Sequence, residues 1–312
     1  MINKYVKSIK NKAFEFMVNK YGNRYIQYRK EWESSQLYKF GEFPLDIALD
    51  LKDACNMQCP QCVRSMKSLL SPNFSSSGKE LNFRMIKKIL DEAKKYHLPS
   101  LTINGGGEPL LYKNIEQLIN YAVKCEMMDI RLITNGILLT GDKFKSLVDA
   151  RLPILSVSLD AFTQETYHRV RGGNLAIPVN NVLKAIELKK DILIRVSFVT
   201  QEGNKHEVND FINFWKDKAD IIDIQAYINY RKESVNPNFE CFEPWRRITI
   251  WHDGRITPCC GFMGYNLSLG NINNSTIYDA WNGSALKEIR KNITNNRYCL
   301  MCIGKREEIS YE

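Results

Sequence analysis

The chain has 312 residues, 44% of them hydrophobic and 25% charged, and a formal net charge of +9. No apolar run approaches the roughly 20 residues that a membrane-spanning helix needs, and residues 1–20 lack the apolar core of a signal peptide, so we expect a cytoplasmic protein with no membrane partner. Basic residues are spread along the chain, which argues against a nucleic-acid partner and is compatible with an anionic small-molecule substrate.

The first 44 residues contain two amphipathic, charge-rich stretches, around Tyr5–Met17 and Arg24–Leu37. Both have the apolar spacing of helices that pack against a larger body. Gly41 and Pro44 then interrupt the pattern. We therefore expect this region to be helical.

From residue 45, short apolar runs typical of strands alternate with helix-like stretches. The expected strands are 45–51, 100–104, 129–134, 154–159, 192–199 and 221–228, and the expected helices lie near 82–96, 114–126, 141–149, 178–190 and 205–217. This alternation predicts a parallel sheet with right-handed crossovers, which either an open doubly wound sheet or a partly closed barrel satisfies. In both arrangements the functional residues lie on loops after the carboxyl ends of the strands.

The alternation stops before residues 231–244, which have the composition of a linker. A hairpin is predicted next, from Ile248–Trp251 through an Asp253–Gly254 turn to Arg255–Pro258. A further helix is expected from Ser284 to Asn292, shortly before the last pair of cysteines.

Nine cysteines are many for a cytosolic protein, in which disulfides are rare and clustered cysteines indicate metal or redox chemistry. Cys55, Cys59 and Cys62 are spaced C-x3-C-x2-C on the loop after the first expected strand. Three thiolates on one loop can surround one inorganic core and leave one metal position open to a substrate or cofactor. A zinc site that borrows a fourth ligand is the alternative.

The spacing of Cys55, Cys59 and Cys62 directly after the first strand resembles the signature of the radical S-adenosylmethionine (SAM) superfamily. The resemblance implies that these three cysteines hold a 4Fe-4S cluster whose fourth iron is chelated by SAM. It also implies that the reduced cluster cleaves SAM to a 5′-deoxyadenosyl radical, which abstracts hydrogen from an unactivated carbon. Family members often have an aromatic residue just before the last cysteine, where this chain has Gln61.

Two further loops match motifs of the same family. Gly106, Gly107 and Glu108 follow the second expected strand and resemble the GGE motif that meets the methionyl amino group of SAM. Asn135 belongs to a Thr-Asn-Gly sequence after the third strand, as in many members. Each motif alone would be weak, but both arrive at the loop where the family places them.

The fourth strand is followed by a stretch that resembles the family's S-x-D…R-G-G pattern. The resemblance implies that Ser158 and Arg171 reach the ribose and the carboxylate of SAM. Asp160, between them, has the alternative role of capping the next helix. Asn204, just past the fifth strand, is a weaker additional candidate.

A second cysteine group can close a tetrahedral zinc site or bind every iron of a 4Fe-4S cluster. Its members are Cys241, Cys259, Cys299 and Cys302, and their spacing resembles the SPASM domain of radical SAM enzymes. A full SPASM domain has more cysteines, so the closer resemblance is to its truncated form, the Twitch domain, which holds one auxiliary cluster. Cys260 is not assigned, because adjacent cysteines rarely serve one cluster.

The pattern and the resemblance together predict an α/β fold, a partial (β/α)6 barrel with a small C-terminal, cysteine-rich α+β domain for the auxiliary cluster. The expected parts are an N-terminal helical extension (1–44), the radical SAM partial barrel (45–235) and the SPASM/Twitch-like domain (236–312). The family also implies a flavodoxin- or ferredoxin-like electron donor.

Three functions are compatible with these patterns. The first is a radical SAM enzyme that acts on a small polar substrate, such as a sugar, aminocyclitol or nucleotide-sugar, by a dehydrogenation in which the auxiliary cluster accepts the second electron. The second is a peptide- or protein-modifying radical SAM maturase. Such enzymes commonly have an N-terminal recognition module with strands and a winged helix, for which residues 1–44 are too short and too helical. The third is a non-enzymatic zinc or iron–sulfur electron-transfer protein. No catalytic acid or base can be named from the sequence.

Overall fold

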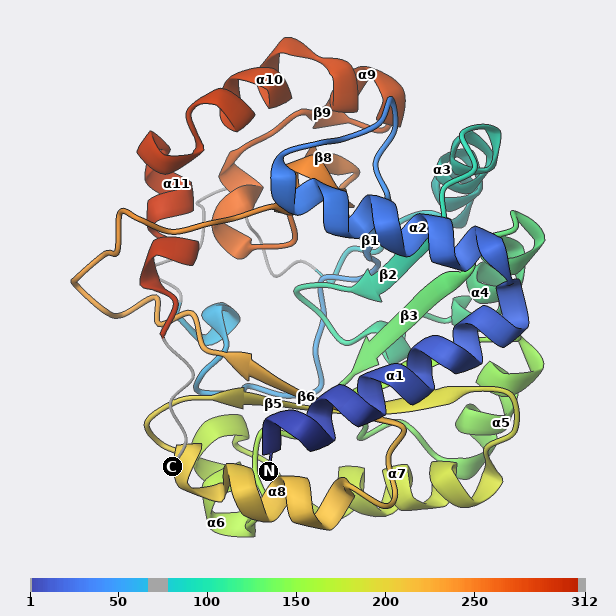
Figure 1. Cartoon of the computed structure of the whole chain (residues 1–312), viewed down its shortest axis with the longest axis vertical. Helices are drawn as coiled ribbons and strands as arrows, with labels where there is room; N and C mark the ends of the chain where they lie inside the picture. Colours follow the sequence, from blue (N-terminus) through green and yellow to red (C-terminus); the bar gives the residue numbers. More distant parts are fainter. Residues whose placement is uncertain (1, 67–77, 308–312) are drawn as a thin grey trace.

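A curved nine-stranded sheet organises the molecule (Figure 1), in a computed structural model that describes residues 2–66 and 78–307. The strand order is β6-β5-β4-β3-β2-β1-β7-β8-β9. The first six strands are mutually parallel: β1 Asp46–Asp50, β2 Ser100–Asn104, β3 Asp129–Thr134, β4 Ile154–Ser158, β5 Leu193–Thr200 and β6 Ile221–Ala226. Each overlaps a strand expected from the sequence, and the fold class, a partial barrel, is confirmed.

Helices join successive strands and lie around the outside of the curved sheet (Figure 1). They are α3 Phe83–Lys95, α4 Ile115–Lys124, α5 Gly141–Asp149, α6 Gln164–Arg171, α7 Ala176–Leu188 and α8 Val208–Trp215. In α3, buried Ile86, Ile89, Leu90 and Ala93 recur at helical spacing and face the strands, and the Asn82 side chain caps the first turn. Among the described residues, no helix is long and apolar enough to cross a membrane.

The helix α6 was not expected as a separate element. It has only eight residues, and its buried side chains are Thr166, Tyr167 and Val170. This apolar pattern is too short to stand out from a loop by periodicity. Its ends are well defined, because Thr163 caps the start and Gly172, in the left-handed region, follows the last residue.

Two helices, α1 Ile2–Tyr21 and α2 Asn23–Ser34, occupy the N-terminal region. Their buried side chains, including Met17 and Tyr28, form a cluster with Met128, Ile154 and Leu193. These last three residues lie at the amino ends of β3, β4 and β5. The two helices therefore cover the amino-terminal end of the barrel, opposite the loops in which function was expected.

The C-terminal part continues the same sheet. Strand β7 Arg247–Ile250 pairs in parallel with β1, and β8 Arg255–Thr257 returns antiparallel to β7. The predicted hairpin is therefore present, with Gly254 of its turn at φ 82°. The remaining elements are β9 Gly270–Asn271, α9 Ile277–Asn282, α10 Ser284–Lys291 and α11 Arg297–Leu300.

The C-terminal part also reaches the opposite edge of the barrel. Beyond β6, Ile228 forms an isolated antiparallel bridge with Arg306. The Asn229 N–H donates to the Lys305 carbonyl oxygen at 3.0 Å, and the Glu307 N–H donates to the Tyr227 carbonyl oxygen at 2.8 Å. The C-terminal part thus contacts β1 through β7, and it contacts the segment that follows β6 through residues 304–307, which we call the seam.

Candidate functional site

The first cysteine group lies on the loop that leaves the carboxyl end of β1. Cys55 is exposed, whereas Cys59 and Cys62 are half-buried. The Cys62 N–H donates to the Cys59 carbonyl oxygen at 2.9 Å, which closes a turn between them. Burial raises the pKa of Cys59 to about 11, the nearby Arg171 guanidinium lowers it, and the charges of Cys62 and Cys55 raise it further. The hydrogen-bonded turn therefore keeps Cys59 and Cys62 together on one loop.

The glycine–acid loop after β2 is hydrogen-bonded to the cysteine loop. The Glu108 N–H donates to the Ala54 carbonyl oxygen at 2.8 Å. The Glu108 carboxylate, 2% exposed, accepts from the Thr134 hydroxyl at 2.6 Å and from the N–H groups of Leu110 and Asn135 at 3.0 and 2.9 Å. Burial raises the pKa of Glu108, and the hydrogen bonds from Asn135 and Thr134 lower it. A buried carboxylate held in this way gains strongly from a neighbouring ammonium group.

Close backbone approach explains the glycine in this loop. A Cβ on Gly107 would lie 2.0 Å from the Lys52 carbonyl oxygen, so no side chain fits. The neighbouring Gly106 is buried. From the loop after β3, the Asn135 amide donates to the Asn56 Oδ1 at 2.7 Å. The loops after β1, β2 and β3 consequently form one hydrogen-bonded unit, which we call the three-loop unit.

Arg171, the last residue of α6, is held beside the cysteine loop by Asp160. Arg171 Nη1 lies 2.7 Å from Asp160 Oδ2. The same carboxylate accepts from the Gln61 side chain at 2.7 Å and from the Val199 N–H at 2.9 Å. Burial alone lowers the pKa of Arg171, but the Asp160 charge raises it well above its ordinary value. Asp160 therefore positions Arg171 and does not cap α6, whose N-cap is Thr163.

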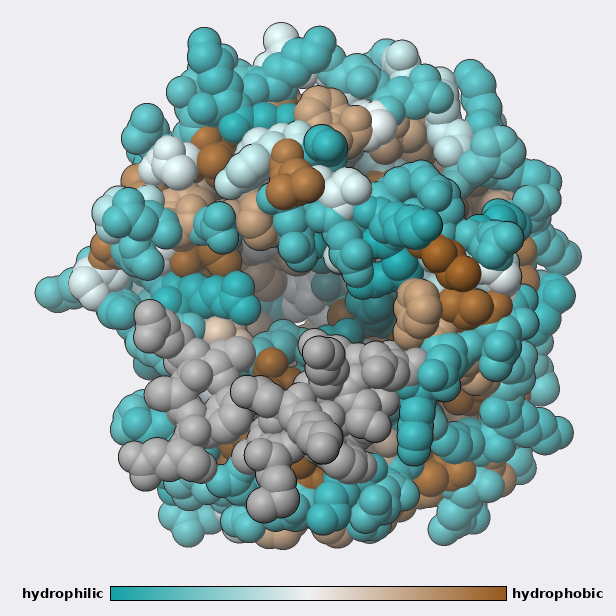
Figure 2. Space-filling model, in the orientation of Figure 1, coloured by the Kyte–Doolittle hydropathy of each residue, from teal (hydrophilic) through white to brown (hydrophobic). Residues whose placement is uncertain are grey.

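One atom of Arg171 is left without a protein partner. Its Nε is buried and makes no hydrogen bond to the described residues. A buried donor without a partner is costly, so a ligand oxygen placed there would be stabilised. The Arg171 charge also lowers the pKa of Cys59 and of Glu108. A cation, an acid and the cysteine loop therefore meet at the carboxyl ends of the strands. The face of the molecule seen in Figure 2 is hollowed near its centre.

Ser158 and Asn204, the remaining candidates from the sequence, differ in burial and in their hydrogen bonds. Ser158 is half-buried, and its Oγ lies 3.5 Å from Ser197 Oγ, so its own proton is available to another acceptor. Asn204 is fully buried, and its amide donates to the carbonyl oxygens of Asp160 and Val199 at 2.8 and 2.9 Å. Asn204 thus stabilises the loop after β5, whereas Ser158 is placed where it could contact a ligand.

The second cysteine group surrounds one small cavity. All four predicted ligands line it: Cys241, Cys259, Cys299 and Cys302. Two glycines make room for the sulfur atoms, because a Cβ on Gly264 would lie 2.5 Å from Cys259 Sγ and a Cβ on Gly261 would lie 3.0 Å from Cys302 Sγ. Sequence reasoning did not single out these glycines. Both lie within five residues of Cys259 in the chain, and this proximity is the signal that could have identified them.

Burial also affects the acidity of these cysteines. It raises the pKa of Cys241 and of Cys302 to about 12. The free thiols are therefore protonated at neutral pH, and cluster binding must displace their protons. Among the described residues, no three Cys, His, Asp or Glu side chains are arranged as a site for a single metal ion.

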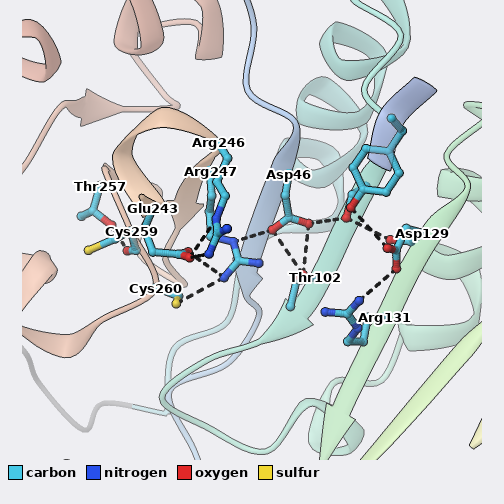
Figure 3. A network of polar contacts seen from close by, with 12 residues as sticks. Asp46, Thr102, Asp129, Arg131, Glu243, Arg246, Arg247, Thr257, Cys259 and Cys260 are labelled. Atoms are coloured by element: carbon cyan, nitrogen blue, oxygen red, sulfur yellow. Dashed lines mark hydrogen bonds and ion pairs between the residues drawn. The ribbon is translucent and has the colours of Figure 1, made fainter. Parts of the chain in front are cut away.

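Cys260 has a different environment from its neighbour Cys259 (Figure 3). It is not among the residues lining the cavity, and Arg247 Nη1 donates to its Sγ at 3.5 Å. Arg247 also pairs with Asp46 at 2.7 Å and with Glu243 at 2.9 Å. Because Asp46 begins β1, this half-buried arginine joins the C-terminal part to the barrel. The contact favours Cys259 over Cys260 as a ligand.

A buried histidine that sequence reasoning missed also joins the two parts. His252, on the β7–β8 turn, places Nδ1 3.0 Å from Asp50 Oδ2 at the end of β1, and its side chain is 3% exposed. Its Nε2 lies 3.9 Å from Asp53 Oδ2, close to the start of the cysteine loop. Burial lowers the pKa of His252, but the hydrogen bond and charge of Asp50 raise it above its ordinary value. Its neighbours in the sequence give no sign of this contact.

Comparison with protein families gives two matches along the chain. Residues 51–214, more than half of the chain, match the radical SAM superfamily. The chain belongs to the radical SAM superfamily. Residues 241–303 match SPASM, an iron-sulfur cluster-binding domain.

Relatives of this radical SAM protein include a Methanocaldococcus jannaschii protein named probable GTP 3′,8-cyclase, 30% identical over 196 residues. The match covers 62% of the present chain and 63% of that protein, less than two thirds of its length. Among solved structures, BtrN in complex with AdoMet and 2-DOIA has a TM-score of 0.59 at 16% identity, over 88% of this chain and 96% of that chain. Streptococcus suis SuiB bound to SAM has a TM-score of 0.63 at 15% identity, over 91% and 78%. These structures share the fold.

Membership of the radical SAM superfamily makes the protein an enzyme that uses SAM and a SAM-binding 4Fe-4S cluster, and the SPASM domain adds an auxiliary iron–sulfur cluster. The residues present fit these groups. The unpartnered Arg171 Nε and the buried Glu108 carboxylate suit the carboxylate and ammonium groups of an amino acid. The second cavity offers four thiols with no other assigned role. A non-enzymatic function therefore loses its support.

Proposed function

We propose that this radical SAM enzyme removes hydrogen from a carbon atom of a small polar, anionic substrate in a net dehydrogenation. A sugar, an aminocyclitol and a nucleotide or nucleotide-sugar are the substrate classes we favour. The observation that carries the proposal is the three-loop unit, which meets Arg171 at the carboxyl ends of the strands. When bound, SAM and the two clusters supply the one-electron chemistry that such a reaction needs.

The cysteines divide into two ligand sets in this proposal. Cys55, Cys59 and Cys62 hold the SAM-binding cluster, and Cys241, Cys259, Cys299 and Cys302 hold the auxiliary cluster. For the first set, the supporting observation is the hydrogen bond that the glycine–acid loop makes to the same loop. For the second, it is the cavity that the four cysteines line.

The side chains of the other loops bind SAM in this proposal. Glu108 pairs with the amino group, since its buried carboxylate lacks a cationic side chain in hydrogen-bond contact among the described residues. Arg171 binds the carboxylate through its free Nε, and Ser158 donates to the ribose. Gly106, Gly107 and Asn135 shape the loop that carries Glu108.

A polar cleft at the carboxyl ends of β5 and β6 is the proposed entrance for the substrate. Its volume is about 430 Å³, and it is lined by Thr200, Gln201, Glu202, Lys205, Lys232, Asn236, Arg306 and Glu307. Its three basic side chains outnumber its two acidic ones, which favours an anionic group. The Gln201 amide donates to the Gln61 side chain, so the cleft adjoins the residue before Cys62. The relative named for GTP, a small anionic molecule, agrees with this class.

Iron content and SAM cleavage test the two ligand sets. We expect about eight irons per chain after anaerobic reconstitution, falling to about four in a Cys55/Cys59/Cys62→Ala variant and to about four in a Cys241/Cys299→Ala variant. Reductive cleavage of SAM, with dithionite or a flavodoxin-like protein as donor, should be lost only in the first variant. Cys260→Ser is the matched control and should keep both clusters. Zinc at either site, or SAM cleavage by the triple variant, would contradict the assignment.

Substrate class is tested by transfer of deuterium from a labelled candidate to the 5′-deoxyadenosine product. Nucleotides, phosphorylated sugars, aminocyclitols and short peptides form the panel, and a phosphorylated small molecule is expected to transfer the label. Lys232→Glu and Arg306→Glu should raise the KM for that substrate by about tenfold, because they reverse charge in the cleft, with cleavage of SAM alone unchanged. Transfer from peptides only would favour the peptide-modifying alternative.

A further inference from the structure

The short segment after β6 contacts the loops of both cysteine groups. The Tyr227 hydroxyl donates to the Gln61 carbonyl oxygen at 3.2 Å, next to Cys62. Three residues later, the Tyr230 hydroxyl lies 3.9 Å from Cys302 Sγ. The two tyrosines therefore reach different sites from one stretch of backbone.

The position of Tyr230 relative to Cys302 is fixed by the backbone on both sides. The segment that carries Tyr230 pairs with the seam, where the Asn229 N–H donates to the Lys305 carbonyl oxygen at 3.0 Å. Lys305 is tied to the second cysteine group in turn, since its N–H donates to the Cys302 carbonyl oxygen at 3.0 Å. The Lys305 ammonium also donates to the Tyr230 carbonyl oxygen at 3.2 Å. The backbone pairing between Asn229 and Lys305 therefore holds the Tyr230 phenol and the Cys302 sulfur atom close to each other.

The chemistry of the two groups decides which one donates. Among the described residues, Cys302 Sγ is the hydrogen-bonding contact of the Tyr230 hydroxyl. A cysteine that binds iron is a thiolate and can only accept, whereas a phenol at neutral pH carries a proton to donate. Hydrogen bonds to the ligand sulfurs are one of the means by which a protein sets the reduction potential of an iron–sulfur cluster. A donor at this position favours the reduced state, in which the cluster carries more negative charge.

We propose that Tyr230 is a positioning residue for the auxiliary cluster, and that its hydrogen bond to Cys302 raises the reduction potential of that cluster. The inference rests on the proposed function, in which Cys302 is a ligand and the auxiliary cluster accepts an electron. The higher potential suits that role. Tyr227 has no part in it, since its hydroxyl is used at the first cysteine loop.

Tyr298 is the matched control for this proposal. It lines the same cavity as the four cysteines, so a change there alters the same surroundings. Its hydroxyl accepts from Arg297 Nη2 at 3.1 Å instead of contacting a sulfur atom. Removal of this hydroxyl therefore changes the polarity near the cavity but removes no hydrogen bond to a ligand.

A redox titration of the reconstituted holoenzyme, followed by electron paramagnetic resonance, tests the role of Tyr230. We expect Tyr230→Phe to lower the equilibrium constant for one-electron reduction of the auxiliary cluster about tenfold, which is about 59 mV. The potential of the SAM-binding cluster should not move, and Tyr298→Phe should leave both potentials unchanged. An unchanged auxiliary potential in Tyr230→Phe, or an equal shift in Tyr298→Phe, would overturn the proposal.

Two further measurements separate the ways in which the experiment could fail. If Tyr230→Phe does not retain the auxiliary cluster, the titration is repeated with 3-fluorotyrosine at position 230. This residue keeps the shape of the ring and is a stronger hydrogen-bond donor than tyrosine. It should shift the potential in the positive direction, and no shift would overturn the proposal. Iron analysis of the wild type is the other measurement: absence of iron at the second cysteine group overturns the ligand assignment, whereas an intact cluster with an unresponsive potential overturns only the role of Tyr230.

Discussion

Asp160 adopts a left-handed backbone conformation, with φ 60°, at a buried position. Such a conformation costs of the order of 1 kcal/mol for a residue with a side chain, although Asp tolerates it better than most. Its side chain offsets the cost, because the carboxylate is shared by Arg171, Gln61 and the Val199 N–H. A single aspartate thereby fixes the last helix residue of α6 against the cysteine loop. Gln61, which stands where the family often has an aromatic residue, is part of this arrangement.

Substitution of Arg171 tests whether its free Nε binds SAM. Arg171→Lys keeps the positive charge for Asp160 but removes the planar donor set. We expect the Kd for SAM, measured anaerobically on the holoenzyme by equilibrium dialysis, to rise about tenfold, which is about 1.4 kcal/mol. Arg169→Lys, on the same helix but paired with Glu165 in solvent, is the control and should bind SAM normally. Equal affinities in the two variants would show that Arg171 has only a structural role.

At the scale of elements, α6 is held at both of its ends. Arg171 fixes its carboxyl end through Asp160. At its amino end, the Glu207 carboxylate accepts from the Phe162 N–H at 2.6 Å, from the Thr163 N–H at 3.2 Å and from the Thr163 hydroxyl. A short helix has little stability of its own, so these contacts decide where Arg171 is placed.

The contribution of Glu207 should depend on pH. Burial alone raises the pKa of Glu207, but hydrogen bonds from Thr163 and Phe162 lower it below its ordinary value. A carboxylate whose pKa is lower in the folded state stabilises the fold above its unfolded-state pKa of about 4.3. That stabilisation is lost as the pH falls through the folded-state value. We expect Glu207→Gln to lower the free energy of unfolding in urea by about 1–3 kcal/mol at about pH 7, and by less below about pH 4.

The control for this measurement is Glu202→Gln. The Glu202 side chain is 87% exposed and pairs with the solvent-exposed Lys205, so its removal should change stability by less than about 0.5 kcal/mol at either pH. If Glu207→Gln lowered the free energy of unfolding by the same amount at low pH as at neutral pH, that result would argue against an ionised carboxylate at this position.

Elements with a strong local pattern were predictable from the sequence. The observed bounds of β2 and β3 equal the expected ranges, because apolar alternation and flanking turns are local signals. The cysteine loop and the glycine–acid loop carry their own motifs. Contacts between distant segments could not be predicted: His252 and Asp50 are 202 residues apart, and Tyr230 and Cys302 are 72 residues apart. The pairing of β7 with β1 is of the same kind, since a hairpin pattern does not say which edge it joins.

At the scale of the whole molecule, the two ends of the barrel have separate tasks. The carboxyl ends of the strands carry the candidate site, and α1 and α2 cover the amino ends. Tyr28 belongs to α2, and its hydroxyl donates to Asp129 Oδ2 at 3.2 Å, which ties these helices to β3. Changes in the cover should therefore affect stability without altering the chemistry.

Met17→Ala tests that separation. Met17 is 1% exposed in the cluster that covers the amino ends, so its truncation leaves a cavity and should cost about 2–5 kcal/mol of unfolding free energy in urea. Leu37→Ala removes an apolar side chain that is 67% exposed and should cost less than about 0.5 kcal/mol. The rate of SAM cleavage per folded molecule should be the same in both variants. A slower rate in Met17→Ala would show that the two ends are coupled.

The seam has a consequence for the order in which the enzyme is built. Residues 304–307 are synthesised after all six barrel strands, so the segment that follows β6 has no seam to pair with while the barrel strands are already available to fold. Until the seam forms, Tyr230 is not held beside Cys302, because the pairing of Asn229 with Lys305 positions both residues. Cys299 and Cys302 are synthesised just before the seam, so the second cysteine group and the pairing that places Tyr230 beside it are completed at the same late step of biosynthesis.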